Sequence, residues 1–169
     1  FGTQTDTLDL EGAVIAESAV RPTLADVAAI LPRFTGAIAQ VPPAYSALMI
    51  DGERAYDRAR AGEVVELKPR AVTIHALAIT GQAGQGPLEQ VTLVAHVSKG
   101  TYIRSLARDI ALALGSVGHV TMLRRLRAGP FALAQAISLD KLNAIGQGAP
   151  LESVILPLEA GLDDIPALS

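Results

Sequence analysis

The 169-residue sequence predicts an α+β fold with a mixed, largely antiparallel sheet flanked by helices. Half of the residues are hydrophobic and only 18% are charged, which is enough to bury the core of a single domain. Two segments rich in β-branched residues, 71–80 and 88–98, are separated by glycines and a proline, as in paired antiparallel strands. Strands and helices are interspersed without a regular strand–helix–strand rhythm, which favours this fold over a doubly wound parallel sheet.

The elements of the first forty residues follow from local signals. The first residues resemble the end of a strand, and a polar turn closed by Gly12 leads into a short strand at 13–17. Thr23 is a helix cap, and the helix predicted over 24–34 ends before Gly36. Its apolar face consists of Leu24, Val27, Ile30, Leu31 and Phe34.

The middle of the chain carries strong turn signals. Pro42 and Pro43 impose an extended approach, and Asp51-Gly52 is a tight-turn signal. These features predict a hairpin-like element over 41–56, followed by a short helix that stops at Gly62.

The strand over 88–98 and the helix that follows it are well defined by periodicity. One strand face holds Val91, Leu93, Ala95 and Val97, so His96 points the other way. We interpret His75 and His96 as sheet residues, not catalytic bases. After Gly100 an amphipathic helix extends to Gly115, with Arg104 and Arg108 one turn apart. Its apolar stripe comprises Ile103, Leu106, Ala107, Ile110, Ala111 and Leu114.

The last third of the chain has shorter signals. We expect a strand over 119–127, a turn at Gly129-Pro130, a short strand around 131–133 and a helix over 139–145 capped by Ser138.

Composition excludes several classes of site. The chain has no cysteine, and its three histidines lack the close spacing of a helical zinc motif, so neither a disulfide scaffold nor a metal is expected. No apolar run is long enough to span a bilayer and no signal segment opens the sequence, so a cytoplasmic location is expected. The start at Phe1 and the acidic, proline-containing end suggest that both ends are cut.

Positive charge is concentrated in one segment. Residues 99–127 hold six Lys/Arg and one acidic residue, whereas the rest of the chain holds eight basic and sixteen acidic residues. Nucleic-acid contact is therefore expected to be local. The simpler interpretation is a solvated helix face and an arginine-rich strand.

The start of the helix after Gly100 suits an anion beside a flat ring. The first-turn amides attract an anion, and Lys99 and Arg104 add charge at the same end. Tyr102 offers a ring on which an unpaired RNA base can stack. Two alternatives stay open here: Tyr102 as a half-buried aromatic at the helix start, and a metabolic enzyme with an anion site at Gly100.

Five separated motifs carry a family resemblance that runs in order over roughly residues 1–142. They are Phe1-Gly-Thr-Gln-Thr-Asp-Thr7, Val41-Pro-Pro-Ala-Tyr-Ser-Ala47, Gly52 to Gly62 with Ala55-Tyr56 and Ala59-Arg60, Ser98-Lys-Gly-Thr-Tyr-Ile-Arg104, and Gly118-His-Val120 through Leu123-Arg-Arg125. With these motifs the sequence resembles the TruB family, bacterial enzymes that convert uridine to pseudouridine in the T-arm of tRNA.

The resemblance implies roles for individual residues. Tyr102 contacts the target base or its ribose, Arg104 pairs with the catalytic aspartate, and Leu123 forms an apolar wall of the base pocket. Tyr45 and Lys99 are further substrate-binding candidates. Candidates for contact with the RNA backbone are Arg108, Arg124, Arg125 and Arg127. The reaction needs no metal and no organic cofactor.

The sequence departs from the family pattern at the nucleophile. The family's Gly-x-Leu-Asp-Pro-like loop, which carries the nucleophilic aspartate, is not present, and Asp6 and Asp9 are interpreted as turn residues. Residues 1–142 are expected to be the C-terminal part of a catalytic domain and 143–169 a connector. The chain alone is predicted to be inactive until a segment with the aspartate completes it. The alternative is a non-catalytic RNA-binding or tRNA-folding module.

Overall fold

A computed structural model describes residues 1–46, 49–50, 53–55, 57, 61, 67–82, 86–146 and 154–161. The chain divides into two compact units, Phe1–Thr121 and Met122–Ser169. The domain boundary expected after residue 142 stays a prediction. The division into compact units falls earlier in the sequence, between Thr121 and Met122.

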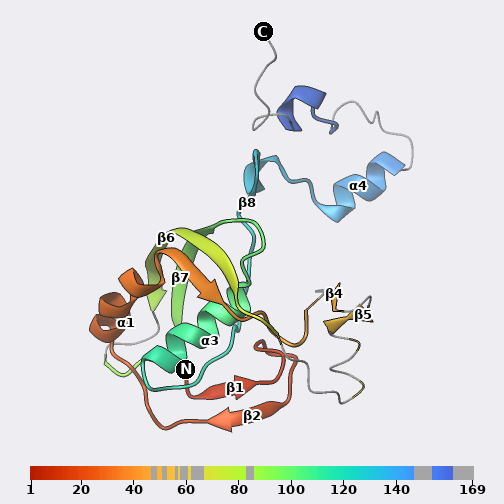
Figure 1. The fold of residues 1–169 in the computed structure, drawn as a ribbon. Helices are drawn as coiled ribbons and strands as arrows, with labels where there is room; N and C mark the ends of the chain where they lie inside the picture. The colour runs from red at the N-terminus through yellow and green to blue at the C-terminus, as the bar shows by residue number, and fades with distance from the viewer. Residues whose placement is uncertain are drawn as a thin grey trace. The chain divides into compact units, whose positions relative to one another are not determined.

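A three-stranded antiparallel sheet in the order β3–β6–β7 forms the centre of the first unit (Figure 1). β6 (Arg70–Gln82) pairs with β7 (Val91–Val97), which confirms the two predicted strands. β3 (Gly36–Gln40) was not predicted. Its sequence is alanine-rich with one β-branched residue, and Gly36, at φ +93°, carries the signal of a helix end.

Helices α1 (Leu24–Ile30) and α3 (Ile103–Ala113) occupy the predicted positions. Thr23 caps α1 as expected, because its hydroxyl accepts a hydrogen bond from the Asp26 amide. The helix predicted over 24–34 is wrong in its last turn, where the 3-10 helix η1 (Leu31–Phe34) follows α1. Pro32 has no N–H with which to continue the α-helical ladder.

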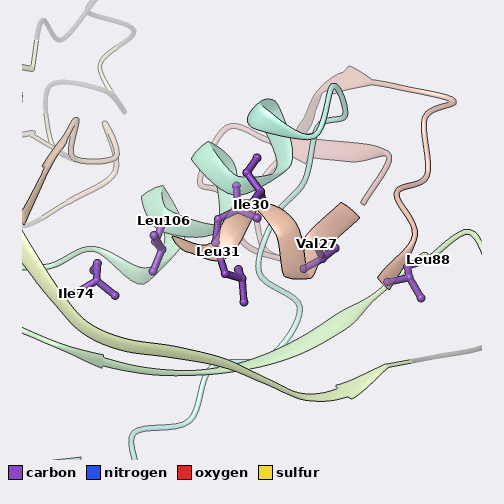
Figure 2. Close-up of a cluster of buried hydrophobic side chains, with 7 residues drawn as sticks. Val27, Ile30, Leu31, Ile74, Leu88 and Leu106 are labelled. Carbon is purple, nitrogen blue, oxygen red and sulfur yellow. The ribbon is translucent and has the colours of Figure 1, made fainter. Parts of the chain in front are cut away.

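The core lies between these helices and one face of the sheet. Figure 2 shows α1 and α3 on the same side of β6 and β7, with buried side chains between them. Its members are Val27, Ile30, Leu31, Ile74, Leu88, Leu106 and Ile110. The predicted inward face of β7 packs against this cluster through Val91, Leu93 and Val97. His96 is exposed, as predicted.

Two hairpins complete the described part of the first unit. β1 (Thr3–Thr5) pairs with β2 (Val14–Glu17), which confirms the strand predicted at 13–17. β4 (Met49–Ile50) pairs with β5 (Glu53–Arg54), as expected of the hairpin-like element. Its Asp51-Gly52 turn and most of the short helix predicted after it lie outside the described residues.

The second unit holds short elements. β8 (Arg127–Ala128) and β9 (Phe131–Ala132) form a hairpin around Gly129-Pro130, followed by η2 (Leu133–Gln135). α4 (Leu139–Gly146) is capped by Ser138, as predicted, and η4 (Leu158–Gly161) comes last.

The strand predicted over 119–127 is wrong. Val120 makes an isolated bridge to Asp9, and Arg127 begins β8. The exposed residues 121–126 between them form no strand. A β-branched or apolar run becomes a strand only beside a partner, and local sequence does not supply one. Among the described residues, no helix is long and apolar enough to cross a membrane.

Candidate active site at the start of α3

Arg104, in the first turn of α3, connects this helix with the turn between β1 and β2 and with the segment that follows Pro43. Its Nη1 donates to the Thr7 carbonyl oxygen and to Asp9 Oδ2, each at 2.8 Å. Its Nη2 donates to the Tyr45 carbonyl oxygen, also at 2.8 Å. These contacts use three of the five guanidinium N–H groups. The guanidinium is thereby held in one orientation, with two N–H groups that have no partner among the described residues.

Asp9 is the charge partner of Arg104. The other carboxylate oxygen, Oδ1, accepts from the Thr7 hydroxyl at 2.6 Å and from the Glu11 amide at 3.1 Å. Burial alone would raise the pKa of Asp9, but the hydrogen bonds from Thr7 and Glu11 and the Arg104 charge outweigh it, so the pKa is lowered. Asp9 is therefore a firmly ionised carboxylate whose oxygens are already occupied.

The turn between β1 and β2 aims these groups at Arg104. Leu8 adopts φ +63°, which non-glycine residues rarely do, and its side chain is buried. The Leu8 carbonyl accepts from the Val120 amide at 3.0 Å, which ties the turn to the segment after α3. Asp6 and Asp9 both lie in this turn, as predicted.

A second arginine of α3 holds the other end of the proline segment. Arg108 Nη2 donates to the Val41 carbonyl oxygen at 3.1 Å, and its Nε donates to Asp109 at 2.8 Å. Pro42 and Pro43 are fully buried between the two carbonyls that the arginines hold. Arg108, predicted to contact RNA, thus has partners inside the protein, and its RNA contact stays a prediction.

Tyr102 is the N-cap residue of α3 and is half-buried. Its backbone N–H donates to Gln40 Oε1 at 2.8 Å, and its carbonyl accepts from Gln40 Nε2 at 3.1 Å. Gly100 adopts φ +84°, and Lys99 is exposed beside it. Because Gln40 occupies the Tyr102 amide, this amide is not available to an anion at Gly100.

The remaining predicted residues belong to the second unit. Leu123 is 62% exposed, and Arg124 and Arg125 are exposed as well. Arg127 donates from Nε to the Gly129 carbonyl within its own hairpin at 2.7 Å. Within the first unit, the structure brings together Tyr45, Tyr102, Arg104 and Arg108. The other four residues, Leu123, Arg124, Arg125 and Arg127, lie in the second unit and are described by themselves.

The described residues contain no group of three or more His, Asp or Glu side chains suited to a metal ion. His75 and His96 are 21 positions apart in the sequence but are neighbours across β6 and β7. The ring centroids of His75 and His96 are 4.8 Å apart. A hollow of about 390 Å³ between α1 and the end of α3 contains none of the predicted site residues.

Sequence reasoning missed Gln40 and the pairing of Arg104 with Asp9. Gln40 lies two positions before Pro42-Pro43, but a lone glutamine at a strand end carries no local signal of a contact 62 residues away. Asp9 was assigned to a turn, and this turn chemistry concealed its second role as an ion-pair partner.

Comparison with known proteins agrees with the motifs. The family model described as the TruB family pseudouridylate synthase N-terminal domain matches residues 1–103, which is more than half of the chain. The chain belongs to the TruB family. A second model, the tRNA pseudouridylate synthase B C-terminal domain, matches residues 104–163.

Individual TruB-family relatives are close in sequence. The tRNA pseudouridine synthase B of Novosphingobium aromaticivorans is 72% identical over 99% of this chain, and that of Zymomonas mobilis is 55% identical over all of it. The matches cover 56% and 54% of those proteins, so the chain spans about half the length of the curated relatives it matches.

A solved structure supports the fold. A chain in the crystal structure of a Cbf5-Nop10-Gar1 complex matches with a TM-score of 0.61 and 26% identity, over 83% of this chain and 39% of that one. The predicted α+β class is confirmed.

Proposed function

We propose that this chain contributes part of the catalytic site of an isomerase that converts uridine to pseudouridine in the T-arm of tRNA. The observation that carries this proposal is the fixed Arg104 guanidinium beside Tyr102 at the start of α3, in a chain of the TruB family. We place the reaction in the cytoplasm.

The chemistry requires a base removed from its stack and an ionised nucleophile. Tyr102 offers a ring against which a flipped uracil can stack. The two remaining N–H groups of Arg104 are suited to a second carboxylate, which they would keep ionised by lowering its pKa. In this proposal that carboxylate is the nucleophile, and it comes from a segment that the present sequence does not include.

Asp9 is a poor candidate for the nucleophile. Its two oxygens already accept from Thr7, Glu11 and Arg104, so attack on a substrate carbon would break several contacts. We assign Asp9 the role of orienting Arg104.

Other residues complete the proposed substrate contacts. Leu123 forms the apolar wall of the base pocket, and Tyr45 and Lys99 bind the substrate. Arg108, Arg124, Arg125 and Arg127 contact the RNA backbone. No cofactor takes part.

The test is pseudouridine formation in a uridine-labelled T-arm stem-loop. The chain is assayed alone and with a separately supplied polypeptide that carries the Gly-x-Leu-Asp-Pro-like loop. We expect activity only in the mixture. Activity of the chain alone would contradict the role assigned to Asp9.

A variant separates catalysis from simple RNA binding. Arg104→Ala in the active mixture is expected to lower the rate about a hundredfold or more, as loss of a fixed electrostatic group does in other enzymes. Arg33→Ala, which removes an exposed arginine of η1, is the matched control. If neither mixture is active and tRNA binding survives Arg104→Ala, the non-catalytic RNA-binding module is the better interpretation.

A further inference from the structure

Gln40 makes a two-point contact that links the end of β3 to the start of α3. Its side chain is 1% exposed. The carboxamide oxygen accepts from the Tyr102 N–H at 2.8 Å, while the carboxamide nitrogen donates to the Tyr102 carbonyl at 3.1 Å. A carboxamide presents one acceptor and one donor side by side, so it can pair with a backbone residue as a neighbouring strand does.

The contact determines how the first turn of α3 begins. Tyr102 has an extended backbone, at φ −97° and ψ 107°, and no side chain caps the helix at this position. Its carbonyl also accepts the first helical hydrogen bond, from the Leu106 amide at 3.0 Å. Gln40 therefore holds the backbone of Tyr102, which sets the direction of the Tyr102 ring. Tyr102 lies two positions before Arg104.

The same segment meets α3 at two further points. Directly after Gln40, the Val41 carbonyl accepts from Arg108, and the Tyr45 carbonyl accepts from Arg104. Residues 40–45 are thus fastened to the first two turns of α3 at three places. Of these contacts, only the one from Gln40 reaches the backbone of Tyr102.

We infer that Gln40 is a positioning residue for the isomerisation, acting through Tyr102 and the first turn of α3. This inference rests on the proposed function. Gln40 does not touch the substrate. It holds Tyr102 where a flipped uracil stacks and keeps the following turn in register with Arg104.

The pairing explains why the residue is a glutamine. Methionine has nearly the same length but neither donates nor accepts strongly at this position. An ionised glutamate offers two acceptors and turns one of them toward the Tyr102 carbonyl. A protonated glutamate reproduces the glutamine pattern, because its O–H donates to that carbonyl and its C=O accepts from the Tyr102 N–H.

Replacement by glutamate therefore provides a rescue by pH. At a position that is almost fully buried, desolvation disfavours the ionised form and raises the pKa of a glutamic acid. Lowering the pH restores the donor, so the rate of Gln40→Glu becomes a larger fraction of the wild-type rate as the solution becomes acidic. Gln40→Met has no group that can respond.

The experiment measures single-turnover pseudouridine formation and tRNA affinity in the reconstituted mixture between pH 5 and 8. We expect Gln40→Met to lower the rate about 10-fold to 100-fold, the scale of a small misplacement of a catalytic group. The tRNA Kd should change less than about threefold, because phosphate contacts dominate affinity. The rate of Gln40→Glu, divided by that of the wild type, should rise toward 1 at acid pH and fall to the Gln40→Met value at alkaline pH.

Two outcomes would overturn the inference while the wild-type mixture is active. One is an unchanged rate for Gln40→Met, and the other is a Gln40→Glu ratio that does not change with pH. If Gln40→Met does not fold, the pH profile of Gln40→Glu decides alone.

A wild-type mixture that makes no pseudouridine contradicts the proposed function instead. Hydrogen exchange of the Tyr102 amide then tests the contact itself. Exchange should be slow in the wild-type chain and faster in Gln40→Met, and equal exchange would refute the positioning of Tyr102 by Gln40.

Discussion

The two units use the same residue types in different ways. In the first unit, Arg104 and Arg108 lie in α3 with side chains 27% and 18% exposed, and each donates to a backbone carbonyl and a carboxylate. In the second unit, Arg124 and Arg125 are exposed. An arginine with several fixed partners can orient a reacting group, whereas an exposed arginine acts mainly through its charge.

Apolar residues show the same contrast. The buried core cluster belongs to the first unit, whereas Ile145 is the one buried hydrophobic side chain among the described residues of the second unit. Many large apolar side chains of the second unit are exposed, including Leu123, Leu126 and Leu139. We therefore expect substitutions in the first unit to change folding stability much more than equivalent ones in the second.

The largest effect is expected from truncation of the core. Ile74 is fully buried, and Ile74→Ala should lower the free energy of unfolding by about 2–5 kcal/mol through lost burial and a cavity. The matched change in the second unit, Leu123→Ala, should stay within about 0.5 kcal/mol. Chemical denaturation measures both, and similar losses would remove the contrast between the units.

The next effect concerns the ion pair in the site. Asp9→Asn keeps the shape of the side chain but removes its charge, and should lower the free energy of unfolding at neutral pH by about 1.5–3 kcal/mol, the range for hydrogen bonds to charged groups. Glu11→Gln is the control, because Glu11 is a neighbouring acid of the same turn that makes no ion pair with the described residues. Denaturation of the two variants and the wild type at pH 7 measures the difference.

The pH dependence of this difference follows from the lowered pKa of Asp9. A lowered folded-state pKa stabilises the fold fully above the unfolded pKa of about 3.9, and this stabilisation is lost as the pH falls through the folded value. The wild type and Asp9→Asn should therefore converge in stability once the pH has fallen below the folded-state pKa of Asp9. A difference that persists there would show that the charge is not its source.

A smaller effect is expected from the exposed cations of the second unit. If Arg124 and Arg125 each meet a phosphate, replacing both with glutamine lowers the slope of log affinity against log salt by about 1 to 2. Folding stability should not change. Titration of tRNA at several salt concentrations measures the slope, and an unchanged slope would exclude both residues from phosphate contact.

The smallest effect compares the helix caps of the two units. Thr23→Ala should lower the stability of the first unit by about 1 kcal/mol, because the hydroxyl that accepts from the first turn of α1 is lost. Thr23→Ser keeps this acceptor and serves as the control. Ser138→Ala removes the corresponding cap of α4 and should leave the unfolding of the first unit unchanged.

Local sequence predicted the elements whose signals are self-contained. The helix after Gly100 has an apolar stripe and a glycine stop, and the capped start of α1 follows from Thr23 alone. β3 was missed and the strand over 119–127 was wrong for one reason, since strand formation depends on a partner elsewhere in the chain.

The residues of the candidate site fall into the same two groups, those that local sequence predicted and those that it did not. Motifs were sufficient to indicate Tyr102 and Arg104, because spacing along the chain is a property of sequence. Sequence did not reveal that Asp9 lies 2.8 Å from Arg104 or that Gln40 pairs with the Tyr102 backbone.

By itself, therefore, the sequence determined the family, the fold class and the helices, because short-range periodicity and motif order carry that information. Only the tertiary structure decided which carboxylate holds Arg104 and which side chain holds Tyr102. Such contacts join residues 62 and 95 positions apart, and a polar side chain carries no local mark of the partner that folding will bring to it.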